Sequence, residues 1–122
     1  IAILDVSAAC HMPDVIEMPY VPPLHGAAEP DDGRKEYQYI LAGPTCLAGD
    51  VIGKYQFDHT LLPGEILLFK DMAIYTTCKN NTFNGMALPN IWRMTPQGEL
   101  IRLTDFGYQD FKTRLGSSRK YS

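Results

Sequence analysis

The residues best suited to chemistry lie in one short segment, Gly43 to Asp50, which reads Gly-Pro-Thr-Cys-Leu-Ala-Gly-Asp. Its glycines and proline predict a tight turn between two strands. That turn would hold the Cys46 thiol close to the Asp50 carboxylate. A thiol can act as a nucleophile or exchange a proton with a reacting group. We therefore interpret this turn as part of an active site.

Two later segments carry further candidates. The first is Tyr75, which follows Asp71-Met72-Ala73-Ile74, and the second is Phe83-Asn84-Gly85. The stretch of sequence between the turn and these two segments is long enough to form two further strands. Alone, Tyr75 is typical of a sheet aromatic and Phe-Asn-Gly of a turn. Together with the turn they predict half of an active site, and no other motif in the chain supplies the second half.

Two less specific readings stay open. Cys46 alone could be a buried structural cysteine, but its position beside Asp50 in a turn makes burial for packing less expected. Asp14 and Glu17 follow Pro13 at a spacing that places both on one helical turn. They could form a solvated helix start, or a pair of anions for a cationic substrate.

We expect no metal site. The histidines and cysteines show no zinc-finger, zinc-knuckle or HExxH spacing, and two of them are adjacent. They are Cys10, His11, His25, Cys46, His59 and Cys78.

The elements that must position these residues are mostly short strands. Pro19 ends any helix beginning at Pro13, and residues 21–33 are rich in Pro, Gly and Asp, which predicts a loop. A helix is expected at residues 106–115 with Asp105 or Thr104 as its cap. This pattern predicts one mainly β domain, a barrel or sandwich with a short C-terminal helix. The predicted strands are residues 1–6, 36–42, 51–57, 66–69, 72–79 and 99–103.

Composition excludes several classes of function. The 122 residues carry a net charge of −3, which offers no basic surface for nucleic acid or anionic lipid. No apolar run approaches the ~20 residues of a membrane span. Three cysteines and no visible secretory leader predict a reducing, cytoplasmic setting. The chain begins inside an expected strand and without methionine, so we expect residues 1–122 to be one domain of a longer protein. The basic residues Arg119 and Lys120 are expected to lie in a solvated tail.

Taken together, these motifs resemble the C-terminal β domain of the fold-type-III pyridoxal phosphate decarboxylases, which include the ornithine, arginine and diaminopimelate decarboxylases. The likeness covers nearly the whole chain and is greatest to the carboxynorspermidine/carboxyspermidine decarboxylases. Besides the segments above, it rests on Ile3-Leu4-Asp5-Val6-Ser7-Ala8, Glu17-Met18-Pro19-Tyr20 and Phe106-Gly107-Tyr108.

The resemblance implies a homodimer in which a (β/α)8 barrel carries pyridoxal 5'-phosphate and this β domain completes the site. It implies that Tyr75 hydrogen-bonds the cofactor phosphate and that Cys46 reaches across the dimer interface towards the substrate α-carbon. Asp50 would support that interface, and Phe83 would line the pocket. An ordinary thiol, with a pKa of about 8.5, is mostly protonated at neutral pH and can donate a proton there.

The resemblance also bears on the substrate. Diaminopimelate decarboxylases have an acidic residue where this chain has Leu47, and an arginine in the segment where it has Glu17. An anion in place of a cation suits a substrate with a distal amine. We therefore expect Glu17, with Asp14, to bind the terminal amine of a carboxylated polyamine. Ile74 departs from the subgroup, which usually has histidine before the phosphate-binding tyrosine.

The Schiff-base lysine and the phosphate loop of the family belong to the barrel and are absent from this sequence. We expect residues 1–122 to be inactive alone and to need the N-terminal barrel portion. The sequence leaves two alternative functions open: a non-catalytic binding or regulatory module derived from the fold, and a related diaminopimelate, ornithine or arginine decarboxylase.

Overall fold

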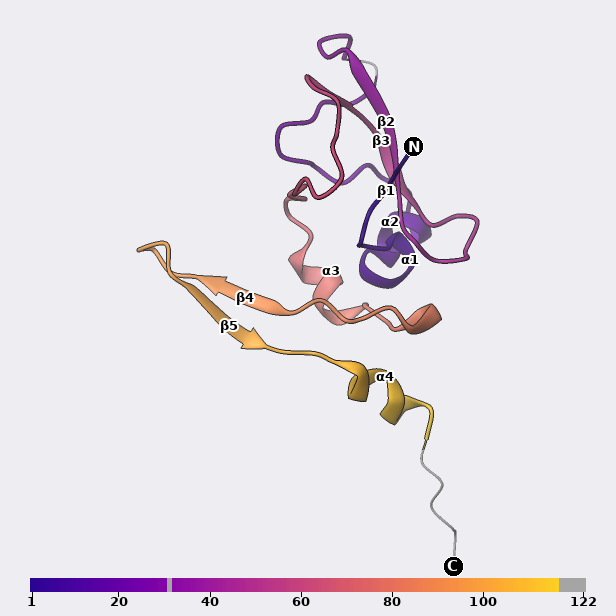
Figure 1. Cartoon of the computed structure of the whole chain (residues 1–122), viewed down its shortest axis with the longest axis vertical. Coiled ribbons are helices and arrows are strands. Elements are labelled where there is room, and N and C mark those ends of the chain that lie inside the picture. The colour runs from indigo at the N-terminus through magenta and orange to yellow at the C-terminus, as the bar shows by residue number, and fades with distance from the viewer. Residues whose placement is uncertain (31, 117–122) are drawn as a thin grey trace, which may run out of the picture.

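A three-stranded sheet forms the first part of the computed structural model, which describes residues 1–30 and 32–116 (Figure 1). Its strands run in the order β1 (Ala2–Ile3), β2 (Tyr37–Ala42) and β3 (Val51–Phe57). β1 is parallel to β2, whereas β2 and β3 are antiparallel, with Tyr37 opposite Phe57. The Gly43–Asp50 segment thus joins two paired strands, as predicted from the sequence.

Two short helices, α1 (Ala8–His11) and α2 (Pro13–Glu17), follow β1 and lie at one end of this sheet (Figure 1). Ser7 caps α1 by accepting a hydrogen bond from the Cys10 backbone N–H at its Oγ, and Pro13 begins α2, where a missing N–H costs nothing. The helices and the inner face of the sheet bury a shared core. Its buried members are Ala8, Met12, Val15, Leu24, Leu41, Ile52, Tyr55 and Phe57.

The C-terminal part is more extended. Helix α3 (Ala73–Cys78) leads to a 3-10 turn, η1 (Phe83–Gly85), and then to the antiparallel hairpin β4 (Ile91–Met94) and β5 (Leu100–Thr104). Helix α4 (Tyr108–Arg114) follows. In Figure 1 the hairpin and α4 lie beyond α3, away from the three-stranded sheet. Neither sheet of the described residues closes into a barrel.

The predicted strand at 72–79 is wrong, because these residues form helix α3. Its Thr, Tyr and Ile content favours a strand, but strand propensity depends on an available neighbour. Here Asp71 adopts a positive φ of 59° and redirects the chain. Thr77 Oγ1 then donates to the Ala73 carbonyl one turn earlier, and the helix contacts α2 instead of a sheet.

The predicted buried strand at 66–69 is also wrong. Ile66 is 91% exposed, and only Phe69 makes a single bridge, to Leu24. The outer edge of β3 is already paired at Gln56, whose backbone exchanges two 2.9 Å hydrogen bonds with Ala28. The predicted strand at 1–6 shortens to β1, and Ile3 is exposed.

The C-terminal elements agree more closely with the sequence. The hairpin closes at Thr95 to Glu99, with Gly98 at a positive φ of 83°. Its second strand, β5, corresponds to the predicted strand at 99–103, whereas β4 was not predicted. Helix α4 lies within the predicted span, but its cap is Gly107, whose N–H donates to Asp110 Oδ2 at 2.8 Å. The expected caps Asp105 and Thr104 precede it. Arg119 and Lys120 lie outside the described residues.

Candidate functional site

Asp50 is a buried carboxylate, 3% exposed, that joins the turn to helix α1. Ser7 Oγ lies 3.0 Å from both of its oxygens, and the Ala9 backbone N–H donates to Oδ1 at 3.1 Å. Within the turn, Thr45 donates to Oδ2 through its hydroxyl at 2.5 Å and its backbone N–H at 3.2 Å. The carboxylate therefore fixes the path of residues 43–50 against the start of α1.

The electrostatics of Asp50 agree with this role. Burial by itself would raise the pKa of Asp50, but the hydrogen bonds from Thr45, Ala9 and Ser7 favour the ionised form and hold the pKa below its ordinary value. Gly43 makes the geometry possible, because a Cβ atom there would overlap the Asp50 carboxyl group.

Helix α1 also holds the segment that contains η1. Asn81 donates to the Ala9 carbonyl through Nδ2 and to the Cys10 carbonyl through its backbone N–H, both at 2.9 Å. The buried Cys10 thiol lies 3.4 Å from the Phe83 carbonyl. The turn and the η1 segment are therefore fixed to the same four-residue helix.

His11 adds a further link on the same helix. Its Nδ1 accepts a hydrogen bond from the Ser7 backbone N–H at 3.0 Å, so Nε2 carries the proton. Nε2 lies 2.9 Å from the Ala87 carbonyl and donates to it. His11 is buried and has a structural role in this chain.

The Cys46 thiol is exposed and lies beside η1. Its Sγ is 3.6 Å from Asn84 Oδ1, to which it donates a weak hydrogen bond. Asn84 adopts a left-handed conformation, with φ 59° and ψ 18°, which asparagine tolerates better than most residues. The adjacent Phe83 ring is 44% exposed. We call Cys46, Phe83 and Asn84 the thiol cluster; it offers a proton donor beside an aromatic surface.

A second group of candidates lies where α2 meets α3. Glu17 forms an ion pair with Lys79, and the Lys79 ammonium lies 5.7 Å from the centre of the Tyr75 ring. Tyr75 is 54% exposed. Pairing with Glu17 raises the pKa of Lys79, so Lys79 is a cation at neutral pH.

Asp14 and Tyr20 complete this group. The Tyr20 hydroxyl donates to Asp14 Oδ2 at 2.5 Å and lies 3.7 Å from Met72 Sδ, just before α3. Burial and the bond to Asp14 raise the pKa of Tyr20 to about 12. We call Asp14, Glu17, Tyr20, Tyr75 and Lys79 the tyrosine cluster.

The predicted residues thus fall into two clusters: one where the 43–50 turn meets η1, and one where α2 meets α3. Cys46 contacts Asn84, the neighbour of Phe83 in η1, while Glu17 pairs with Lys79 beside Tyr75, and Asp14 is linked through Tyr20 to Met72 at the start of α3. Sequence reasoning missed Lys79, and it missed the contact of Asn84 with Cys46. Lys79 stands four residues after Tyr75, a spacing that matters only on a helix, and the segment was predicted as a strand. The Asn-Gly pair was visible as a turn, but not its contact with Cys46.

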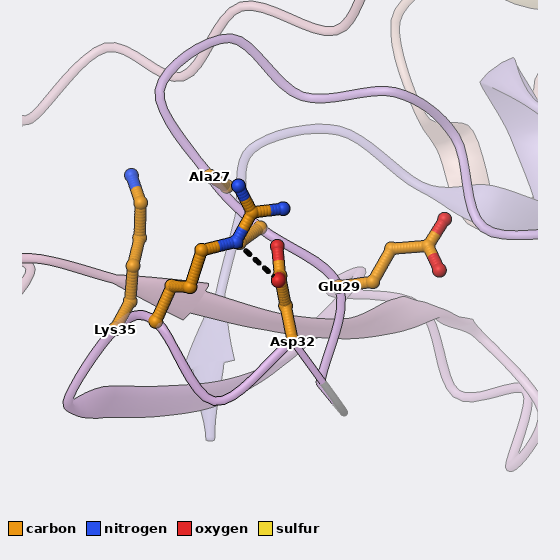
Figure 2. A pocket seen from close by; sticks show the side chains of 6 residues that line it. Ala27, Glu29, Asp32 and Lys35 are labelled. Carbon is orange, nitrogen blue, oxygen red and sulfur yellow. Dashed lines mark hydrogen bonds and ion pairs between the residues drawn. The ribbon is translucent and has the colours of Figure 1, made fainter.

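Two hollows of the described chain lie away from both clusters, one of them lined mainly by residues 1–6 and 61–67. The other, of about 730 Å³, is lined by Ala27, Ala28, Glu29, Asp32, Arg34 and Lys35, with an ion pair between Arg34 and Asp32 (Figure 2). None of its lining residues belongs to either cluster. Across residues 1–30 and 32–116, no three histidines, cysteines or acids gather as a metal site, and the helices there are too short or too polar to cross a membrane.

Comparison with known proteins identifies the family. The family described as "Pyridoxal-dependent decarboxylase, C-terminal sheet domain" matches residues 1–73, which is more than half of the chain. The chain therefore belongs to the pyridoxal-dependent decarboxylases, as part of their C-terminal sheet domain. The expected family, fold class and pyridoxal phosphate cofactor of that family are confirmed.

Individual relatives refine the comparison. The chain is 47% identical over 115 residues to carboxyaminopropylagmatine decarboxylase of Synechocystis sp., covering 94% of this chain and 29% of the relative. It is 42% identical over 123 residues to carboxynorspermidine/carboxyspermidine decarboxylase of Campylobacter jejuni, covering 93% and 32%. The crystal structure of C. jejuni carboxynorspermidine decarboxylase with norspermidine superimposes with a TM-score of 0.87 at 42% identity, covering 93% of this chain and 33% of that one. The chain thus spans about a third of these relatives.

Proposed function

We propose that this chain is the C-terminal part of a pyridoxal phosphate-dependent decarboxylase that acts on carboxynorspermidine or carboxyspermidine in polyamine biosynthesis. It works with an N-terminal barrel portion, in a cytoplasmic homodimer. The observation that carries the proposal is the likeness, over more than nine-tenths of the chain, to relatives named for these two substrates. The thiol and tyrosine clusters supply groups suited to that reaction.

The tyrosine cluster fits the phosphate of the cofactor. The Tyr75 phenol is half exposed and donates no hydrogen bond to another described residue, so it is free to donate to a phosphate oxygen. The Lys79 ammonium lies beside its ring and restrains it. When bound, pyridoxal phosphate supplies the electron sink for the carbanion left as CO2 departs.

The thiol cluster supplies the proton. Cys46 Sγ holds a proton in an exposed position, and Asn84 Oδ1 orients that proton through the weak hydrogen bond. We propose that Cys46 delivers it to the substrate α-carbon across the dimer interface. Asp50 would support this interface by fixing the turn that presents the thiol, through its hydrogen bonds with Ser7, Ala9 and Thr45.

Three residues are proposed to hold the distal end of the substrate. Glu17, with Asp14, would bind a terminal ammonium, and Phe83 would line the pocket beside the methylene chain. Glu17 is paired with Lys79 in this chain, so a substrate ammonium would share the carboxylate with Lys79 or replace it. The neutral Leu47, 43% exposed beside Cys46, adds apolar surface there.

A second candidate substrate is favoured by the comparison. The relative with 47% identity is named for carboxyaminopropylagmatine, whose distal group is a guanidinium instead of an amine. A carboxylate such as Glu17 can bind a guanidinium through two parallel hydrogen bonds. Both candidates therefore require an anion at the same place, and only turnover distinguishes them.

The test is CO2 release by the full-length, cofactor-loaded enzyme with carboxynorspermidine, carboxyspermidine, carboxyaminopropylagmatine and diaminopimelate. We expect turnover of a carboxylated polyamine or its agmatine analogue, and none by residues 1–122 alone. Cys46→Ala should lower kcat by about 10²- to 10⁴-fold, whereas Cys78→Ala, at another exposed thiol, should not. Absence of turnover with every substrate would favour a non-catalytic module, and turnover of diaminopimelate alone would favour that decarboxylase.

A further inference from the structure

Helix α3, which carries Tyr75, is weakly embedded in the chain. None of its six residues is buried. Two side-chain contacts with the α2 region hold it: the Glu17–Lys79 ion pair at its end and the approach of the Tyr20 hydroxyl to Met72 at its start. Met72, which begins α3, packs against the core, and Asn81 beyond its end is bonded to α1, so the ends of the helix are fixed. The orientation of the exposed Tyr75 side chain between these points depends on polar contacts at the helix surface.

Lys79 is the residue through which these contacts reach Tyr75. Its backbone N–H donates to the Tyr75 carbonyl at 2.8 Å and closes the last turn of α3. Its ammonium lies over the Tyr75 ring and is paired with Glu17 on α2. A cation over an aromatic ring restrains both groups. Lys79 thus joins the ring of Tyr75 to the Glu17 carboxylate, which stands 62 residues before Lys79 in the sequence.

We propose that Lys79 is a positioning residue which, through its ion pair with Glu17, orients Tyr75 towards the cofactor phosphate and so couples the substrate side of the site to cofactor affinity. This inference rests on the proposed role of Tyr75. It gives Glu17 a second role besides binding the substrate, because loss of Glu17 would lower the affinity for the cofactor even when no substrate is present. An exposed ion pair and a cation–π contact are individually weak, so the expected effect is modest.

The test is the dissociation constant of pyridoxal phosphate from the full-length enzyme, measured by absorbance or fluorescence titration of the apoenzyme without substrate. We expect Lys79→Met and Glu17→Gln each to raise it about three- to tenfold. Lys79→Arg should restore most of the affinity. Lys54→Met, at an exposed lysine of β3 outside both clusters, is the matched control and should leave it unchanged.

The direction in which Glu17→Gln changes the dissociation constant of pyridoxal phosphate shows whether Lys79 positions Tyr75 or only attracts the phosphate by its charge. If Lys79 only attracts the phosphate, removing the neighbouring anion should tighten cofactor binding. If Lys79 positions Tyr75 through Glu17, binding should weaken, and the double variant should be no worse than Lys79→Met alone. Tighter or unchanged binding in Glu17→Gln, or additive losses in the double variant, would overturn the inference.

Tyr75→Phe distinguishes failure of this inference from failure of the proposed function. If Tyr75→Phe weakens cofactor binding while Lys79→Met does not, only the positioning role is wrong. If Tyr75→Phe has no effect, the phosphate role of Tyr75 is wrong, and the inference fails with it. An increase in substrate KM in Glu17→Gln that Lys79→Met lacks would report the separate contact of Glu17 with the substrate.

Discussion

At the scale of single residues, Asp50 shows how a charged group can be buried without instability. A desolvated carboxylate is costly unless donors surround it, and here Ser7, Ala9 and Thr45 provide them. In the sequence, the motif Cys-Leu-Ala-Gly-Asp identified Asp50 as a candidate. Its partners Ser7 and Ala9 stand more than 40 residues earlier, so spacing along the chain could not reveal them.

We expect the stability conferred by Asp50 to depend on pH. Because the pKa of Asp50 in the folded chain is below the ordinary value of 3.8, its ionised form stabilises the fold above that value. This contribution is lost as the pH falls through the lowered folded-state pKa. Asp50→Asn should therefore reduce the free energy of unfolding by about 1–3 kcal/mol at pH 7 and by much less at a pH below the lowered pKa of Asp50.

Urea unfolding of the 122-residue chain at a series of pH values would measure this difference. Asp5→Asn, at an exposed aspartate before α1, is the control and should show little effect. A difference between wild type and Asp50→Asn that does not change with pH would contradict the ionised, hydrogen-bonded state of Asp50.

At the scale of elements, the Gly43–Asp50 turn and helix α1 behave as one unit. The sequence predicted both strands that flank the turn, because each has the alternating or apolar pattern of a strand and ends at turn residues. It did not predict α3, because the same residues have high strand propensity and no local signal reports the contact with α2. Tyr75 was therefore identified as a candidate but assigned to the wrong element.

The close approach of Gly43 to Asp50 gives a test of this unit. Gly43→Ala should destabilise the chain by about 1–3 kcal/mol, because its Cβ would displace the Asp50 carboxyl group. Gly49→Ala is a matched control in the same turn, since a Cβ there meets no atom within 4 Å. Thermal unfolding monitored by circular dichroism compares the two. Equal melting temperatures would show that the turn can adapt to a larger residue.

At the scale of the whole molecule, the described chain has an uneven core. All of its buried core residues lie between Ala8 and Phe57, and the elements from α3 to α4 contribute none. The separation is visible in Figure 1, where the β4–β5 hairpin and α4 extend away from the three-stranded sheet. Local stability follows buried apolar contact, so the two parts should differ in how readily they open.

Hydrogen exchange should show this difference directly. In the isolated 122-residue chain, we expect amides of β2 and β3 to exchange at least about 100-fold more slowly than those of β4 and β5. Exchange measured by mass spectrometry or NMR would report it segment by segment. Equal protection of the hairpin and the central sheet would mean that the C-terminal elements are stabilised by contacts outside those described.

The sequence alone determined the family, the central strands and the identity of the thiol, carboxylate and phenol candidates, because these depend on local patterns and on motifs read along the chain. Only the tertiary structure decided which of them meet. Cys46 reaches Asn84, and Lys79 reaches Glu17, through folding that joins segments 38 and 62 residues apart. The physical reason is that α3 and η1 take their form from long-range contacts with α1 and α2, and such contacts leave no periodic signal in the sequence.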